Sequence, residues 1–452
     1  MASESGSSGI DVTLSQAGFH VFGDLRVLIK KANAEKTEDR ERNALVNNDH
    51  VSGDFDHMTA RVNPRLVTAM VWASWTAIML PRMVVVPLLP TIEQAYRVTH
   101  AQAGLLMTSY YYPYTIMQIP AGALSDRFGR RRFIVVSLIG SSLASLAFWM
   151  VQGFEQMLLF RAIAGFFAGL WYAPSISYLT ASVRDEHRGK AMGMALSGPS
   201  VSDAVIFLMV GMLGVDDFGW RNYFLIYAFP GFFCGLANWF VVREPVKRAY
   251  NAAKPTVQPG EVRRVLSNRV LSGILLHSII FSLAMYSLRT FVPVYLVQSR
   301  ALSPSQASFL MLSYAISVVM SGPLGGYIFD WLGCGLPSLI ALCIMGVVAV
   351  ALPIAPMGGA MVIVLLLWGL MGQWSINSFS VVLTRLVPPQ ARGTFLGIQN
   401  SCLFFAAATG PLVLGYVADI GGFNVFFASA LGLFVLAFLV AVPVLKAQWR
   451  TG

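Results

Sequence analysis

Twelve long apolar runs, beginning at Leu66, limit the possible folds more than any other feature of the sequence. Each run is close to the roughly 20 residues that an α-helix needs to cross a bilayer. Only 12% of the residues are charged, whereas soluble domains carry about 25%. We therefore predict an all-α membrane protein with twelve transmembrane helices, near residues 66–90, 101–125, 132–151, 156–182, 189–213, 222–242, 270–297, 304–329, 336–355, 359–386, 393–418 and 423–445.

The basic residues favour alternate loops, and this bias predicts the orientation. Lys and Arg concentrate in cytoplasmic loops, and here they follow the second, fourth and sixth spans, as in the run Arg130, Arg131, Arg132. We expect both termini to be cytoplasmic, with the chain in the cell's inner (plasma) membrane. The net charge of +10 then reflects topology and contact with anionic lipid, so nucleic acid is not an expected partner.

The sequence matches itself at a constant shift of 204 residues. Gly122, Asp126 and Gly129 fall on Gly326, Asp330 and Gly333, and Arg188 falls on Arg392. Shared membrane composition would explain matched leucines, but not matched aspartate and arginine. We predict two pseudo-symmetric six-helix bundles at 63–243 and 269–446. They are flanked by an N-terminal cytoplasmic tail (1–62), a linker (244–268) and a C-terminal tail (447–452).

The loop after the second span reads Gly122-Ala-Leu-Ser-Asp126-Arg127-Phe-Gly129-Arg130 and resembles the signature loop of the major facilitator superfamily. A degenerate copy runs from Gly326 to Gly333, where the second half should carry it. The resemblance implies the major facilitator fold, transport by alternating access, and a monomer. We expect no enzyme activity, cofactor or bound metal, because the chain has neither a GxxxxGK[ST] phosphate loop nor an HExxH motif.

By the same resemblance, this loop is a cytoplasmic gate that stabilises the outward-open state. The alternative is a plain basic loop that obeys the positive-inside rule. The predicted gate residues are Gly122, Asp126, Arg127, Arg130, Arg188, Asp330 and Arg392.

Charged side chains inside the predicted spans indicate the substrate. Each costs roughly 2.5–3.5 kcal/mol to insert at the bilayer centre, and the candidates are Arg82, Arg161, Asp203 and Arg289. Shifting Arg82 by the repeat offset gives Tyr286, about one helical turn from Arg289. Two guanidinium groups from matching helices predict a site for carboxylate or phosphate. The alternative is that each arginine reaches the interface or pairs with backbone carbonyls.

Within the superfamily, the chain resembles the anion:cation symporters, which carry organic acids. The stretch Leu80–Pro90 is similar to that family, and Arg82, Arg161 and Arg289 match arginines of its first, fourth and seventh spans. Two positions depart from it: Pro81 stands where an acidic residue often precedes the first-span arginine, and Ala168 where a glutamate is common. The resemblance therefore does not support proton coupling through those two positions.

Asp203 is the carboxylate placed deepest within a predicted span. It is expected either to carry a proton or to pair with Arg161, and we assign the two residues to ion coupling. His277 is expected to be a core or solvated histidine. Further substrate-binding candidates share a helix face or offer an amide, and are Tyr111, Tyr114, Tyr286, Gln373, Trp374, Asn377 and Asn400.

The sequence thus predicts a secondary active transporter of small organic anions, with carboxylates as the first choice and H⁺ or Na⁺ as the coupling ion. One alternative is exchange of organophosphate against phosphate. A second is efflux of lipophilic or cationic compounds, which the intramembrane arginines disfavour. A third is a transporter-like sensor or structural membrane protein.

Overall fold

The computed structural model describes residues 63–242, 267–387 and 392–449, and these form helices without any β-strand. The predicted N-terminal tail, nearly all of the predicted linker and the last three residues of the chain lie outside the described residues. The structure also does not describe the side chains of residues 392–394 and 447–449, of Ile119 or of Asp330.

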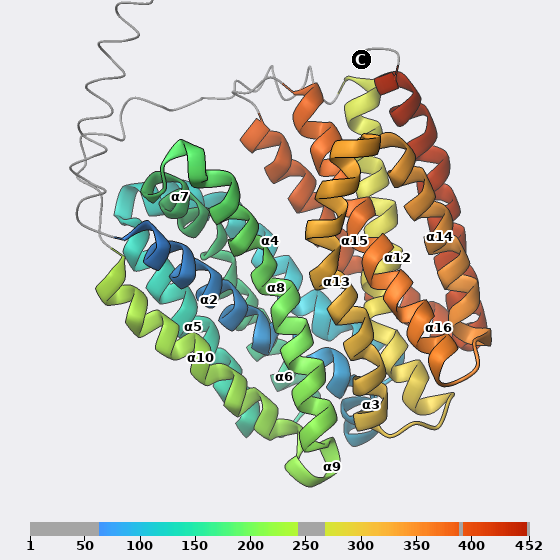
Figure 1. Ribbon diagram of the computed structural model, residues 1–452. Coiled ribbons are helices and arrows are strands. Elements are labelled where there is room, and N and C mark those ends of the chain that lie inside the picture. The colour runs from blue at the N-terminus through green and yellow to red at the C-terminus, as the bar shows by residue number, and fades with distance from the viewer. Residues whose placement is uncertain (1–62, 243–266, 388–391, 450–452) are drawn as a thin grey trace, which may run out of the picture. The chain divides into compact units, whose positions relative to one another are not determined.

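The first half of the chain contains nine α-helices among its described residues (Figure 1). They are α2 (Pro64–Met83), α3 (Val85–Tyr96), α4 (His100–Phe128), α5 (Arg130–Ala147), α6 (Phe154–Gly169), α7 (Tyr172–Ser182), α8 (Asp185–Leu213), α9 (Val215–Phe218) and α10 (Trp220–Val241). A short 3₁₀ helix, Phe148–Met150, follows α5.

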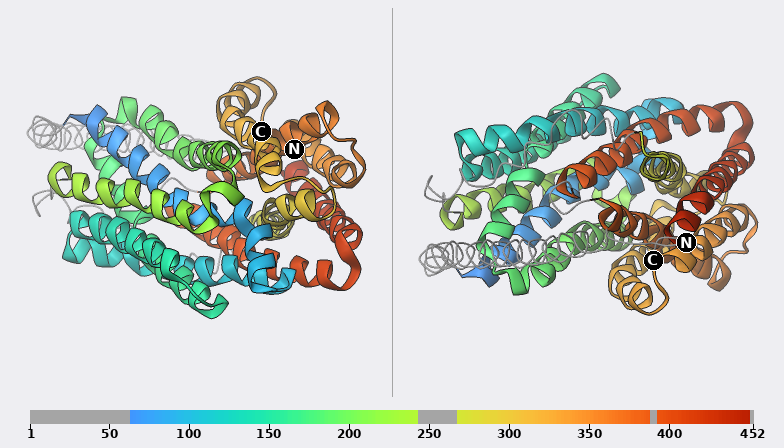
Figure 2. Two further views of the ribbon diagram at one scale, coloured as in Figure 1. Left: turned by 90° about the horizontal axis from the view of Figure 1, so that it is seen from below. Right: turned by 90° about the horizontal axis from the view of Figure 1, so that it is seen from above.

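The second half contains α12 (Arg269–Gln298), α13 (Pro304–Leu332), α14 (Gly335–Ile354), α15 (Gly359–Leu386) and α16 (Arg392–Trp449). α16 is two helices that meet at Gly422, whose φ of 70° is not helical. In Figure 2 the blue-to-green helices and the yellow-to-red helices gather mainly on opposite sides.

Every predicted span falls on helical segments of the described chain, and the all-α membrane fold is confirmed. Ten segments of the described chain are long and apolar enough to cross a membrane; one of them, Phe395–Lys446, combines two predicted spans, and α4 is not among the ten. Large apolar side chains face outward, such as Phe240 and Ile354, which are 77% and 72% exposed. Such a surface suits lipid and would be a liability in water.

The sequence repeat reappears in the backbone. α4 and α13 both begin and end at positions 204 residues apart. Each starts with a capping box, in which Thr99 or Ser303 binds the backbone of the glutamine three residues later while that glutamine binds back. Arg97 and Ala301, two residues before each cap, share a left-handed φ of 52°. The two halves therefore use the same local geometry to enter equivalent helices.

Two predicted spans are each built from a pair of helices. The first breaks at Val84, between α2 and α3, in a stretch that contains Pro81 and Pro87. Proline lacks the N–H that a continuous helix would use. The fourth span breaks at Leu170 and Trp171, between α6 and α7. The first break places Arg82 in the last turn of α2.

Glycine permits the close helix contacts around the centre of the molecule. A Cβ on Gly165 of α6 would lie 2.1 Å from the carbonyl oxygen of Tyr110 on α4. A Cβ on Gly104 of α4 would lie 2.6 Å from the carbonyl oxygen of Pro411 on α16. Small residues allow such backbone approach in membrane bundles, so α4 packs closely against both its own half and the other.

Candidate functional site

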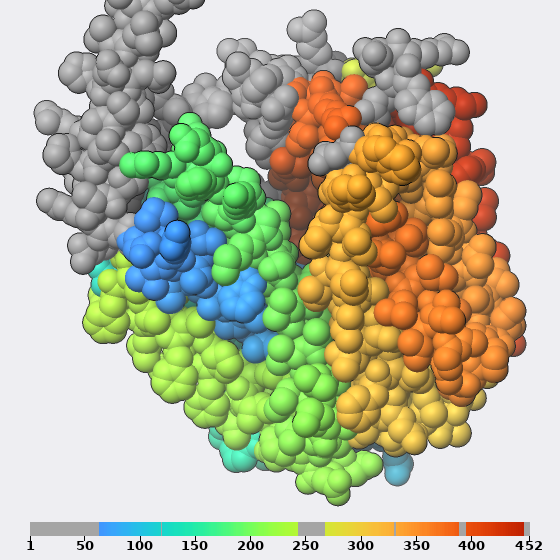
Figure 3. All heavy atoms as spheres, viewed as in Figure 1, coloured from blue at the N-terminus to red at the C-terminus, as the bar shows by residue number. Residues whose placement is uncertain are grey.

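A cavity of about 190 Å³ lies between the two halves. Figure 3 shows the surfaces of the two halves in contact through the middle of the view, along α8 and α13, and separated toward its upper end. The first half lines the cavity from α2, α4, α7 and α8, and the second from α12 and α16. The lining residues are Trp75, Met79, Arg82, Met83, Tyr111, Tyr114, Tyr172, Leu196, Pro199, Asp203, Tyr286, Arg289, Asn400 and Phe404.

An ion pair crosses this cavity from one half to the other. Arg289 of α12 donates from Nη2 to a carboxylate oxygen of Asp203 on α8. The Asp203 side chain is only 6% exposed and that of Arg289 17%. Nε of Arg289 is buried without a hydrogen-bond partner in the described part of the chain. The guanidinium therefore retains a donor for a further acceptor.

Arg82 occupies a different environment, formed mainly by aromatic rings. Its guanidinium carbon lies 4.4 Å from the ring centre of Tyr111, 4.6 Å from that of Tyr114 and 5.1 Å from that of Phe404. Nη1 lies 3.5 Å from the sulfur of Met79. Nε is buried without a hydrogen-bond partner, and within the described residues no carboxylate lies at ion-pair distance. Aromatic faces partly compensate a cation but do not neutralise it.

The cavity therefore has an excess of positive charge. Two guanidinium groups, of Arg82 and Arg289, face one carboxylate, that of Asp203. With all three ionised, one positive charge has no counterion, and an uncompensated buried charge is costly. A small anion in the cavity would relieve this cost and reach the free donors of both arginines. Anion binding is the chemistry that this arrangement supports.

One of the two roles expected for Asp203, pairing with Arg161, was wrong, because Asp203 pairs with Arg289. Arg161 of α6 is 2% exposed and donates to three backbone carbonyls: Leu106 at 3.2 Å, Pro81 at 3.3 Å and Arg82 at 3.1 Å. The last two belong to the interrupted end of α2, where strong acceptors are available to a buried donor. Arg161 thus fixes the backbone that carries Arg82.

Several predicted binding residues do line the cavity, namely Tyr111, Tyr114, Tyr286 and Asn400. Seven lining residues were not among the predicted site residues, and three of these are aromatic: Trp75, Tyr172 and Phe404. Helical spacing could have indicated two of them. Trp75 lies seven residues before Arg82, and Phe404 four residues after Asn400, so each shares a helix face with a candidate.

The predicted residues of α15 do not line this cavity. Gln373 donates to Asn377 at 3.0 Å, and the indole of Trp374 donates to the carbonyl of Ser321 at 3.0 Å. His277 is a core residue, as one reading of the sequence held. Its ring lies 3.7 Å from that of Phe379, and its Nδ1 is 3.1 Å from the carbonyl of Ala437.

The described gate residues make local contacts. Asp126 pairs with Arg130 at 3.5 Å. Arg188 donates to the carbonyl of Thr180 at 2.9 Å and pairs with Asp185. A Cβ on Gly122 of α4 would lie 3.7 Å from Cβ of Ala173 on α7, an ordinary contact. Arg127 lies over the ring of Phe128, 5.3 Å from its centre. The partners expected in the second half, Asp330 and Arg392, have side chains outside the described set, so gate closure stays a prediction.

Among the residues that the structure describes, no cluster of three or more His, Cys, Asp or Glu side chains is placed to hold a metal ion.

The family model described as Major Facilitator Superfamily matches residues 71–408. The chain belongs to the major facilitator superfamily. The resemblance read from the Gly122–Arg130 loop is therefore confirmed, and superfamily members of this kind are transporters and not enzymes.

Two curated relatives cover about three quarters of this chain and have different names. A D-galactonate transporter of Escherichia coli is 24% identical over 375 residues, covering 74% of this chain and 84% of the relative. The multidrug resistance protein MdtG of Salmonella paratyphi A is 25% identical over 363 residues, covering 77% and 88%.

Solved structures agree on the superfamily fold. The nucleoside transporter NupG superposes with a TM-score of 0.73 at 14% identity, covering 84% of this chain and all of NupG. A bacterial homologue of the human lysosomal transporter Spinster, in an inward-facing and occupied conformation, gives a TM-score of 0.69 at 18% identity, covering 84% and 95%. At these identities the likeness concerns the fold.

Proposed function

We propose that this superfamily member is a secondary active transporter of small organic anions, with carboxylates as the main class. One observation carries the proposal: Arg82 and Arg289, from matching spans of the two halves, face one cavity that holds a single carboxylate. The D-galactonate transporter among the relatives supports an organic acid as substrate. We further propose that the chain acts as a monomer in the inner (plasma) membrane with both termini in the cytoplasm.

In the proposed mechanism, the substrate competes with Asp203. The carboxylate of the substrate binds Arg82 and Arg289, and Asp203 loses its pairing with Arg289. A buried carboxylate without its cation favours the protonated form. Asp203 then takes up a proton that offsets the charge of the bound anion, so the cavity carries the same net charge when it is loaded as when it is empty. Asp203 is in this way the coupling residue for H⁺, with Na⁺ as the alternative ion.

Arg161 has a positioning role in this mechanism. Its bonds to the Pro81 and Arg82 carbonyls hold the end of α2 in place. Because Arg82 extends from that same end, the direction of its guanidinium depends on Arg161. The expected contribution is orientation of the anion site and not transfer of the coupling proton.

Uptake by purified protein in liposomes tests the proposal, with D-galactonate as the first probe of a panel of carboxylates and phosphate esters. Arg82→Lys and Arg289→Lys keep the charge but lose the two-pronged donor geometry. Each is expected to lower kcat/KM by roughly tenfold or more, about 1.4 kcal/mol. Arg97→Lys, at an exposed arginine, is the matched control. Wild-type transport by both cavity variants would contradict the proposal.

A multidrug carrier is the second candidate, because the cavity is rich in aromatic side chains and MdtG is among the relatives. Trp75, Tyr172 and Phe404 could contact a lipophilic compound. Transport of such a compound should not depend on the two-pronged donor geometry of arginine, so it should continue in Arg82→Lys. Exchange of phosphate esters, the remaining alternative, requires a counter-substrate inside the liposome and no pH gradient.

A further inference from the structure

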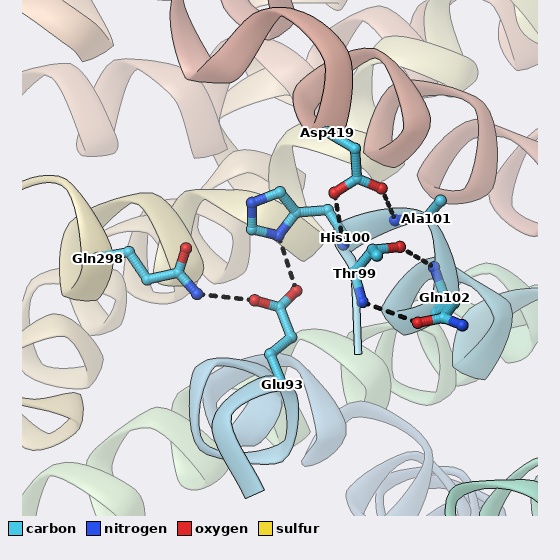
Figure 4. A network of polar contacts seen from close by, with 7 residues as sticks. All are labelled: Glu93, Thr99, His100, Ala101, Gln102, Gln298 and Asp419. Atoms are coloured by element: carbon cyan, nitrogen blue, oxygen red, sulfur yellow. Dashed lines mark hydrogen bonds and ion pairs between the residues drawn. The ribbon is translucent and has the colours of Figure 1, made fainter. Parts of the chain in front are cut away.

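A polar network built around one buried carboxylate joins the two halves at the end of the molecule opposite the arginine-rich loop between α4 and α5 (Figure 4). Glu93 of α3, which is 4% exposed, lies at its centre. One carboxylate oxygen of Glu93 is 3.0 Å from Nδ1 of His100, and the other accepts from Gln298 of α12 at 2.8 Å. The first contact lies within the first half, and the second crosses to the other half.

Asp419 of α16 adds a second link between the halves. Its two carboxylate oxygens accept from the backbone N–H groups of His100 and Ala101, at 2.8 and 2.9 Å. These are among the first N–H groups of α4, and a negative charge at a helix N-terminus is stabilising. A helix of the first half is therefore capped by a carboxylate of the second half, as Figure 4 shows.

This arrangement has no equivalent at the matching place in the repeat. Shifting His100 by 204 residues gives Pro304, and shifting Asp419 back by the same number gives Val215. The neighbouring capping boxes are preserved in both halves. Helix entry alone therefore does not require the histidine and the aspartate, and their presence at one copy indicates a role in how the halves meet.

We propose that Glu93, His100, Gln298 and Asp419 form a proton-sensitive outer gate, which stays closed while His100 is protonated. Closure brings the second half against His100 through Gln298 and Asp419. Opening toward the outside must break both cross-half contacts and expose the pair of Glu93 and His100 to water. A proton on His100 compensates the buried carboxylate of Glu93 and is further stabilised by the nearby charge of Asp419.

The charged groups around His100 come from two packed elements, Glu93 of α3 and Asp419 of α16. The other faces of the ring meet Phe291 of α12 and Phe423 of α16. Burial lowers the pKa of His100, but the hydrogen bond to Glu93 and the charges of Glu93 and Asp419 outweigh it and raise that pKa overall. When the halves separate, His100 loses Asp419, and water weakens its contact with Glu93, which stays in the same half. The pKa of His100 then falls toward its ordinary value near 6.5.

The sign of the pH effect follows from this difference. The closed gate holds the proton more tightly than the open gate, so acid favours closure. The stabilisation is complete below about pH 6.5 and is lost as the pH rises through the elevated pKa of the closed state. Alkaline pH should therefore shift the population toward the outward-open state, whether or not substrate is present.

A distance measurement between spin labels tests the gate without any substrate. The four native cysteines are replaced by serine, and labels are attached at Gln152 and Met357. These exposed positions follow α5 and α14, in equivalent outer loops of the two halves. In lipid nanodiscs, the full-length protein should give mainly the short distance at about pH 5.5 and a growing long distance toward about pH 8. A distribution that does not change over this range would overturn the proposal.

Two variants separate the effect of the proton on His100 from the effect of the Asp419 carboxylate that caps α4. His100→Asn keeps an uncharged donor near Nδ1, and should raise the long-distance fraction at acid pH and abolish the pH response. Asp419→Asn removes the charge that caps α4, and should raise the ratio of open to closed by roughly tenfold at acid pH. Gln102→Ala, which removes a capping bond of α4 that stays within the first half, is the control and should resemble the parent protein.

An unchanged pH response in His100→Asn would show that another group titrates, and would contradict the proposal. Should that variant fail to fold, the distance measurements on the parent protein over the pH range and on Asp419→Asn still test the proposal. Because no substrate is used, loss of the anion proposal would leave this result intact. Failure of the gate proposal would likewise leave the anion proposal intact, because Arg82 and Arg289 lie in the central cavity and not in this network.

Discussion

Arg289 on α12 and Asp203 on α8 form a buried ion pair that links the two halves across the central cavity. Arg82, on the same cavity, is surrounded by aromatic rings. The two arginines are therefore not equivalent. In the proposed mechanism, an incoming anion meets a guanidinium without a carboxylate partner at Arg82 and a carboxylate competitor at Arg289. This difference would connect substrate binding to the protonation of Asp203.

Replacing Asp203 should separate binding from coupling. In Asp203→Asn the competitor for Arg289 loses its charge, so anion affinity should stay the same or increase. The same change removes the proposed proton carrier, so a pH gradient should no longer drive accumulation, while exchange of labelled against unlabelled substrate continues. Uptake and exchange in liposomes measure the two effects. Gradient-driven accumulation at the wild-type level would contradict the coupling role.

Replacing Arg161 should affect stability and affinity but not the pH profile. Arg161→Gln loses most of the donors that bind the Leu106, Pro81 and Arg82 carbonyls, and unsatisfied buried acceptors cost about 1–3 kcal/mol each. The melting temperature should fall and KM should rise as Arg82 loses its orientation. The pH dependence of the remaining transport should match wild type. A flattened profile, as expected for Asp203→Asn, would restore Arg161 to ion coupling.

Substitution of Gly165 tests the close approach of α6 to α4. Gly165→Ala would bring a Cβ to 2.1 Å from the carbonyl of Tyr110, and overpacking of this kind costs about 1–3 kcal/mol. A lower melting temperature of the purified protein is expected. Gly193→Ala is the matched control, because that glycine is also helical and its Cβ would meet nothing within 4 Å. Equal melting temperatures for the two variants would argue against the tight contact.

Much of the architecture could be predicted from the sequence because its determinants repeat. The apolar runs define the helices, and the 204-residue shift gives the matching of α4 with α13 down to their caps. The same shift brought Arg82 and Arg289 into comparison. Their presence on one cavity follows from two halves that pack with their equivalent helices facing the centre.

The partners of the buried arginines could not be predicted in the same way. Arg161 finds backbone acceptors because α2 breaks beside Pro81, and a sequence pattern does not show which carbonyls a break makes available. Asp203 lies 86 residues from Arg289, and Asp419 lies 319 residues from the N–H of His100. Such pairings depend on helix rotation and tilt, which neither hydropathy nor the positive-inside bias determines.

Calorimetric titration of the purified protein tests the central claim most directly. D-galactonate, or the best carboxylate from the uptake panel, is compared with a neutral analogue that has hydroxyl groups but no carboxylate, such as galactitol. The carboxylate should bind wild-type protein and lose roughly tenfold or more in affinity with Arg82→Lys or Arg289→Lys, and the neutral analogue should not bind measurably. Equal binding of both compounds, unaffected by either substitution, would contradict an anion site at Arg82 and Arg289.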